Sequence, residues 1–299
     1  MNNLSANTRH GIFYAIGAFG FWGLAPIYFK TLDSVLASEI LMHRIVWSVV
    51  FLFFILASSR QLRTLRAIFS SPKTLSWLIL SSSLIAANWG VYIWAVNHNM
   101  IIEASLGYYI NPLVTIFLGS VFLGERPTRF QYIAIFLAFL AVVYQVITLG
   151  SLPIISLSLA LLFGFYGLVR KRISIPSLPG LYVETLLLAP VALIYWAFLL
   201  YQHQSTFTFG ANISWLLILA GPVTVIPLLA FNSATVRLRL STIGYFQYLA
   251  PTITLFLAVS IYNEPLTQEK LITFSLIWTA LVLVSLESYF KRKNLQKGK

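Results

Sequence analysis

Long apolar runs, each bounded by polar or helix-breaking residues, divide the chain into ten segments. A transmembrane helix needs about 20 predominantly apolar residues to cross the hydrocarbon core of a bilayer. The pattern predicts spans at residues 11–31, 37–57, 75–97, 103–123, 130–148, 153–170, 180–201, 213–236, 241–261 and 270–290. We expect the first span to be retained, because it has no small-residue cleavage pattern and contains Trp22, Pro26 and Tyr28. The pattern therefore predicts an all-α polytopic membrane protein with ten transmembrane helices.

The composition excludes the soluble classes of protein. Hydrophobic side chains make up 59% of the 299 residues and charged side chains only 9%, against about 25% charged residues in soluble globular proteins. There is no cysteine, which excludes a thiolate metal site or a catalytic thiol, and the four histidines are dispersed along the chain. Motifs for zinc hydrolysis, phosphate loops and dinucleotide binding are absent from the sequence. We therefore expect no metal, no cofactor and no enzyme activity.

The net charge of +12 is explained by topology. Alternate segments between the predicted spans hold 17 of the 20 basic residues, the opposite segments hold only Lys30 and Lys270, and Arg44 lies within a span. An excess of Lys and Arg marks cytoplasmic segments. This asymmetry predicts that both termini are cytoplasmic, and it removes the reason to expect a nucleic-acid partner.

The two halves of the chain repeat each other. Four matches occur in the same order, namely Gly20–Gly23 with Gly164–Gly167, Glu39–Leu41 with Glu184–Leu186, Ser105–Tyr109 with Thr242–Phe246, and Pro112 and Glu125 with Pro251 and Glu264. Because five is odd, a second set of five helices crosses the membrane in the opposite sense to the first. The sequence predicts inverted repeats at residues 1–150 and 151–299, a plan typical of secondary transporters with a substrate site between the halves.

Several of these segments resemble a known family. They are Glu39–Ser48, Ser105–Leu113, Gln247–Thr252 and Glu264–Pro265, and they make the chain similar to drug/metabolite transporters of the EamA type and, within them, to the RarD permeases. The resemblance covers essentially the whole chain. It implies ten helices in two five-helix repeats, cytoplasmic termini, a location in the bacterial inner membrane, and transport without an ATPase subunit.

Ionisable side chains within the spans are candidates for coupling transport to an ion gradient, because such groups are costly in the membrane and usually face a cavity or a partner. Glu39 and His43 are four residues apart and share a helix face, whereas Arg44 is rotated by about 140° from Glu39. In one interpretation, Glu39 or His43 is a protonation site, and Arg44 holds the carboxylate or a substrate anion. In the other, the three side chains form a salt-bridge and hydrogen-bond group that fixes helix packing. Glu184 is the repeat equivalent of Glu39, but Ala189 and Pro190 replace the basic pair.

Polar and aromatic residues deep within the spans are candidates for substrate binding. Asn88, Trp89 and Tyr92 lie on one predicted helix, where cavity lining competes with plain helix packing. The full set of substrate candidates adds Trp22, Tyr108, Asn111, Tyr166, Asn232, Gln247 and Tyr248.

Prolines within spans are candidate hinges, because proline leaves the carbonyl four residues earlier without its helical partner. They are Pro26, Pro112 and Pro251, of which the last two occupy equivalent positions in the repeats. Glu125 and Glu264 are expected to cap helix ends.

The sequence therefore favours a secondary transporter that moves a small organic metabolite or drug by alternating access, with proton coupling open. A cavity rich in aromatics and poor in charge favours an amphipathic solute, aromatic or weakly cationic. Lipid is the other expected partner. Two alternatives are a membrane-embedded enzyme acting on lipid-linked substrates and a non-transporting assembly or sensor subunit.

Overall fold

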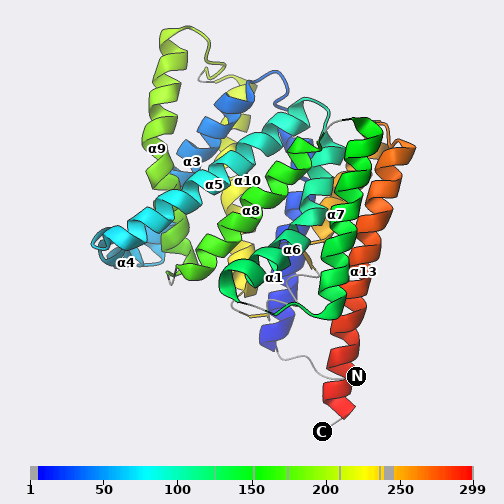
Figure 1. Cartoon of the computed structure of the whole chain (residues 1–299). Coiled ribbons are helices and arrows are strands. Elements are labelled where there is room, and N and C mark those ends of the chain that lie inside the picture. The colour runs from blue at the N-terminus through cyan, green and yellow to red at the C-terminus, as the bar shows by residue number, and fades with distance from the viewer. Residues whose placement is uncertain are drawn as a thin grey trace.

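Helices make up the regular structure of the chain, and no strand occurs in its described part. This computed structural model describes residues 6–297 except 125, 151, 174, 209, 236 and 239–245. The helices are α1 (Ala6–Gly23), α2 (Ala25–Lys30), α3 (Ala37–Ser58), α4 (Leu62–Phe69), α5 (Pro72–Asn97), α6 (Ile101–Leu123), α7 (Arg129–Leu149), α8 (Ile154–Arg172), α9 (Ser177–Tyr201), α10 (Asn212–Thr235), α12 (Leu249–Ser260) and α13 (Gln268–Lys297) (Figure 1). The prediction of an all-α protein is confirmed for these residues.

The helices differ in whether they are long and apolar enough to cross a membrane. Among the described residues, seven helical segments are long and apolar enough to cross a bilayer: α1 with α2, then α3, α5, α6, α7, α9 and α10. Two further apolar helices, α8 and α12, are shorter. The tenth predicted span lies in α13, which continues into the basic tail and several of whose side chains lie outside the described residues. Residues 241–245, which were predicted to open the ninth span, lie outside the described residues.

The prolines act differently in three helices. Pro26 stands at the start of α2, so the first predicted span is divided into α1 and α2 just before it. Pro112 lies inside α6, which continues for eleven residues beyond it. Pro251 is the third residue of α12, where a proline removes no helical hydrogen bond. The roles of Pro26, Pro112 and Pro251 as hinges stay predictions.

Helix packing connects the two halves of the chain. α6 packs on α8, α5 packs on α8, and α7 packs on α13, while α3 lies against both α9 and α10. Two glycines permit close approach. A Cβ on Gly107 would come within 2.7 Å of the Ser156 carbonyl oxygen, and one on Gly221 within 2.6 Å of the Trp47 backbone. Small residues at such contacts let membrane helices pack tightly.

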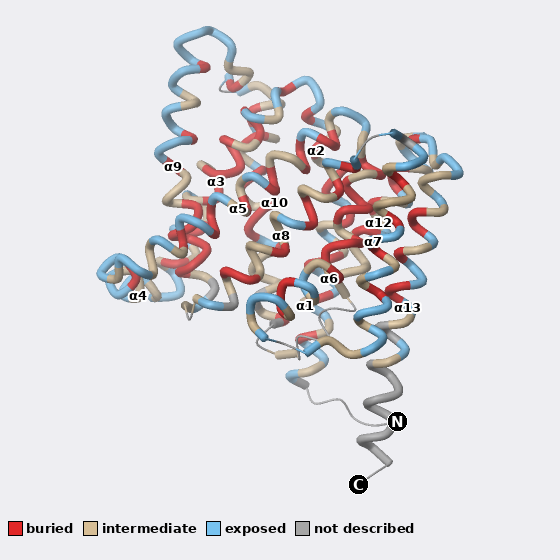
Figure 2. Tube along the Cα trace, viewed as in Figure 1, coloured by how far each residue is buried: buried red, intermediate tan, exposed pale blue. Residues whose placement is uncertain are grey.

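Buried side chains fill the interior, and apolar side chains also cover much of the outside (Figure 2). On α9, which lies at one edge of the molecule, Val191 and Ile194 are 69% and 70% exposed. On α7, Phe139 is 60% exposed. Water would penalise such surfaces, whereas lipid tails do not, so these helix faces suit contact with lipid.

Candidate functional site

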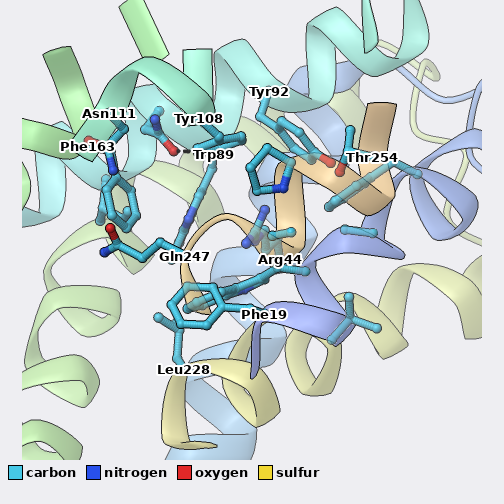
Figure 3. A pocket seen from close by; sticks show the side chains of 18 residues that line it. Phe19, Arg44, Trp89, Tyr92, Tyr108, Asn111, Phe163, Leu228, Gln247 and Thr254 are labelled. Atoms are coloured by element: carbon cyan, nitrogen blue, oxygen red, sulfur yellow. Dashed lines mark hydrogen bonds between the residues drawn. The ribbon is translucent and has the colours of Figure 1, made fainter. Parts of the chain in front are cut away.

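A cavity lies between helices drawn from both halves of the chain (Figure 3). Its lining residues are Phe19, Trp22, Ala25, Phe29, Arg44, Ile85, Asn88, Trp89, Tyr92, Tyr108, Asn111, Phe163, Val223, Leu228, Gln247, Ala250, Pro251 and Thr254. The space open to the centres of water molecules is about 100 Å³, and about 10–15 Å³ suffices for one water. The cavity therefore has room for more than a single solvent molecule.

Arg44 is the charged residue of this lining. It extends from α3 into the centre of the cavity, and its side chain is buried, with the residue 7% exposed (Figure 3). Its guanidinium carbon lies 4.2 Å from the centre of the Trp89 ring and 5.6 Å from that of Phe29. Its Nε has no hydrogen-bond partner among the described residues.

Amide and hydroxyl groups supply the remaining polar lining. Asn88 donates from Nδ2 to the Leu159 carbonyl at 3.1 Å and accepts a hydrogen bond from the Tyr108 hydroxyl at 3.3 Å. The Oδ1 of Asn111 is buried without a partner. Thr254 donates from Oγ1 to the Gly23 carbonyl at 3.3 Å. Asn88 is therefore largely committed to the protein, whereas Asn111 keeps an acceptor available.

Aromatic rings form much of the wall. Phe19 and Trp22 meet edge to face with ring centres 5.4 Å apart, and Phe29 and Tyr92 do so at 5.9 Å. Trp22 and Tyr92 were predicted from the sequence as substrate-binding residues, whereas Phe19, Phe29, Phe163 and Thr254 were not. Helical spacing was the available signal for Phe19, which precedes Trp22 by three residues and so shares its face.

Three of the substrate candidates lie elsewhere or are not described. Tyr166 is not part of the lining, and its ring packs on Phe163 at 5.9 Å. Tyr248 stacks on Tyr109 at 6.5 Å, also outside the lining. The side chain of Asn232 lies outside the described residues. The cavity thus brings together Trp22, Asn88, Trp89, Tyr92, Tyr108, Asn111 and Gln247 with Arg44 and Pro251.

Glu39 is not part of the cavity but holds the loop between α9 and α10. Its Oε1 accepts hydrogen bonds from the Ser205 hydroxyl and the Thr206 backbone N–H, both at 2.9 Å. Its Oε2 accepts from the Thr206 hydroxyl at 3.0 Å. The carboxylate is fully buried, so it joins the start of α3 to a loop of the second half. We call this contact the Glu39 latch.

His43 lies beside the Glu39 latch. Its Nε2 is 3.9 Å from Glu39 Oε1, and its Nδ1 accepts a hydrogen bond from the Trp47 indole at 3.3 Å. The imidazole stacks on Phe207, with ring centres 5.0 Å apart, and meets Trp196 edge to face. Glu39 and His43 therefore share one face of α3, as their spacing predicted, and Arg44 points into the cavity away from them.

Glu184 forms a second buried contact. It accepts hydrogen bonds from the Ser81 hydroxyl of α5 and, at 3.3 Å, from Arg170 near the end of α8. Glu184 is 1% exposed and the Arg170 side chain 19%. The sequence indicated no basic partner for Glu184, because Arg170 precedes it by fourteen residues on another helix. We call this contact the Glu184 latch.

Glu264 caps a helix, as the sequence predicted. Its two carboxylate oxygens accept hydrogen bonds from the backbone N–H groups of Ile101 and Ile102, each at 2.9 Å. These N–H groups open α6, where helical partners are missing and the helix dipole favours a negative charge. Its repeat equivalent Glu125 lies outside the described residues. No group of three or more possible metal ligands occurs in the described part of the chain.

Comparison with known proteins gives the family. The model of the EamA-like transporter family matches residues 9–147. The chain is 47% identical over 289 residues to the Protein RarD of Salmonella typhi, covering 96% of this chain and 98% of that protein. It is 44% identical over 298 residues to the Uncharacterized transporter YojE of Bacillus subtilis, covering 98% and 99% of the two chains.

A solved structure supports the fold. A protein crystal structure that is 17% identical in sequence superimposes with a TM-score of 0.59, covering 95% of this chain and 98% of that one. At this identity the likeness concerns the fold alone. The family and the relatives at high identity point to membrane transport rather than to enzyme activity. The chain belongs to the EamA-like transporter family, as a RarD-like membrane transporter.

Proposed function

We propose that the protein is a secondary transporter that moves a small organic solute across the bacterial inner membrane by alternating access. In this proposal the chain crosses the membrane ten times, both termini are cytoplasmic, and residues 1–150 and 151–299 are inverted five-helix repeats. The observation that carries the proposal is the cavity, because its wall combines α1, α3, α5 and α6 of the first half with residues of α8, α10 and α12 of the second. A site between two similar halves is exposed to either side when the halves rock.

The helix contacts support a repeat relationship. In the proposed repeat the counterparts of α1, α3, α5, α6 and α7 are α8, α9, α10, α12 and α13. When each helix is exchanged for its counterpart, the contact of α1 with α10 becomes that of α8 with α5. The contact of α1 with α12 becomes that of α8 with α6. The pairs α3 with α9, α6 with α12, and α7 with α13 are their own counterparts. Such self-paired contacts surround the axis of a two-fold arrangement.

Two turns also recur at equivalent positions. Gly124 and Asn263 both adopt positive φ, at 67° and 52°, and each directly precedes the glutamate of the repeat signature. Arg60 after α3 and His203 after α9 form another such pair, with φ of 56° and 55°. A left-handed residue commonly ends a helix.

The two latches suit gates at opposite ends of the cavity. Glu184 lies 17 residues before the end of α9, which is about 25 Å of helix, and the loop beyond that end contacts Glu39. Glu39 and Glu184 are repeat equivalents, so an inverted repeat places them near opposite membrane faces. We propose that the Glu39 latch is the coupling site, because a proton on this carboxylate would oppose the three donors that hold the loop.

Metabolite efflux tests the transport function. Liposomes containing the purified chain are loaded with a bacterial metabolite extract, and loss of each compound is followed by mass spectrometry. We expect a small subset of organic solutes to leave faster than from protein-free liposomes. Equal efflux of all compounds from both preparations would contradict transport.

Coupling is tested separately with the solute so identified. Glu39→Gln is expected to abolish uptake driven by a proton gradient while leaving counterflow exchange largely intact. The matched control is Asp33→Asn, which removes an exposed carboxylate close to α3. Gradient-driven uptake by Glu39→Gln at the wild-type rate at every pH would exclude Glu39 as the coupling site and leave alternating access in place.

A further inference from the structure

Arg44 gives the cavity a positive charge that no carboxylate among the described residues pairs with. Among the lining residues that the structure describes, the others are apolar, aromatic or neutral polar side chains. In the described part of the chain, ion pairs join Arg170 to Glu184 and Lys270 to Glu103, and His43 lies 3.9 Å from Glu39. The nearest carboxylate along α3 is that of Glu39, and its oxygens accept hydrogen bonds from Ser205 and Thr206.

The rings beside Arg44 compensate only part of its charge. A guanidinium over the face of a tryptophan gains a cation–π attraction, here with Trp89 at 4.2 Å. The N–H donors of a guanidinium lie in its plane and point along its edges. Stacking on Trp89 therefore leaves those donors to be satisfied by other groups, and Nε has no partner. A buried charge in a protein is normally paired and hydrogen-bonded.

The shape and chemistry of the lining indicate what completes the site. A carboxylate accepts two parallel hydrogen bonds from a guanidinium, which is the geometry that arginine matches best. Around Arg44 the wall is aromatic, because Phe19, Trp22 and Phe29 line the cavity together with Trp89. Such a wall suits an apolar or aromatic body attached to the anionic group.

We propose that the cavity binds a small organic carboxylate, with the carboxylate paired to Arg44 and an apolar body against the aromatic wall. This assignment rests on the proposed transport function only for its consequence, namely that such an anion is the solute moved. It replaces the weakly cationic solute favoured by composition, because a cation would meet an uncompensated like charge at Arg44. The unpartnered Oδ1 of Asn111 offers an acceptor to any donor that the solute carries.

Three probes of similar length that differ in the charge of their polar group test which charge the cavity prefers. The probes are 3-phenylpropanoate, 3-phenylpropanamide and 3-phenylpropan-1-amine, titrated into the purified full chain while tryptophan fluorescence is followed. Trp22 and Trp89 line the cavity and report occupancy. We expect the carboxylate to bind roughly ten- to a hundredfold more tightly than the amide, as for a hydrogen-bonded charge pair, and the amine to bind most weakly. An amine or amide that binds as tightly as the carboxylate would overturn the proposal, as would no binding by all three at millimolar concentration.

Variants locate the effect. Arg44→Gln is expected to remove the preference for the carboxylate over the amide, and Arg44→Lys to keep part of it. The matched control is Lys30→Gln, which removes a cation outside the cavity lining and should leave the preference unchanged. An unchanged preference in Arg44→Gln would overturn the assignment. If Arg44→Gln fails to fold, the three-probe titrations of the wild type and of Arg44→Lys still test the proposal. Complete loss of the preference for the carboxylate over the amide is not expected in Arg44→Lys.

Acetate distinguishes an organic ligand from a bare anion. It is expected to bind at least tenfold more weakly than 3-phenylpropanoate, because it lacks the apolar body. Equal binding would overturn that part of the proposal. Binding with the predicted preference but no flux of 3-phenylpropanoate in liposomes would contradict transport of this class of anion and leave the cavity assignment standing.

Discussion

Glu39 and Glu184 are matched positions in the proposed repeat, yet their surroundings differ. Hydroxyl groups and a backbone N–H hold the Glu39 latch. The Glu184 latch contains the cation Arg170 together with Ser81. An opposite charge nearby favours the ionised form of a carboxylate, whereas neutral donors do so less strongly. The comparison shows that positions matched in the proposed repeat differ in their partners, with an arginine at Glu184 and hydroxyl and backbone donors at Glu39.

Removing Arg170 is expected to have the largest effect on stability. Arg170→Gln leaves the Glu184 carboxylate buried without its cation, which should lower the free energy of unfolding by about 3 kcal/mol. Chemical or thermal unfolding of the purified chain in detergent measures the loss. The double variant Arg170→Gln with Glu184→Gln should recover part of it, because no unpaired charge remains. If the double variant loses as much as the sum of the two single variants, the pair does not act as a unit.

Neutralising Glu39 is expected to cost less. Glu39→Gln keeps one acceptor oxygen for the loop but loses charge-assisted hydrogen bonds, so a decrease of about 1.5 kcal/mol is expected. The same unfolding measurement checks it, with Asp33→Asn as the exposed control. A loss larger than that of Arg170→Gln would reverse the contrast between the latches.

Removing one hydroxyl donor of the Glu39 latch should produce a smaller loss of stability that is confined to the loop between α9 and α10. Ser205→Ala removes one of the hydrogen bonds to Glu39 Oε1 but leaves the Thr206 backbone N–H in place. We expect a loss of about 1 kcal/mol and faster hydrogen exchange in residues 202–208 than in α5 beside the Glu184 latch. Uniformly faster exchange at both latches would show that they are not independent.

The smallest effect is expected for Asn263→Gly, in the turn before Glu264. Asn263 adopts φ of 52°, as Gly124 does in the first half with φ of 67°. Asn263→Gly should therefore change stability by less than about 0.5 kcal/mol, whereas Asn263→Ala should cost about 1 kcal/mol. Comparing the two variants by thermal unfolding separates the backbone conformation from the loss of the side chain. Equal losses would mean that the side chain, not the positive φ, matters here.

The sequence predicted the helical class, most helix positions and part of the site, because apolar length and helical spacing are local properties. Asn88, Trp89 and Tyr92 line the cavity from one helix, as their spacing allowed. The partners of Glu39 could not be predicted, since Ser205 lies 166 residues away in a loop with no distinctive pattern. Phe163 rather than Tyr166 reaches the cavity, because neighbouring helices decide which face of α8 turns inward. The short helix α4 was missed, since it lies in a segment read as a charged connection.

Two-sided access to the cavity tests the central claim most directly. The chain contains no cysteine, so Ala250→Cys places a single thiol in the cavity lining. The variant is reconstituted in liposomes, and a membrane-impermeant thiol reagent is supplied from outside or enclosed within, with protein orientation determined independently. Alternating access predicts labelling from either side, and the carboxylate solute should slow both reactions. Labelling from one side only, with or without that solute, would contradict the account.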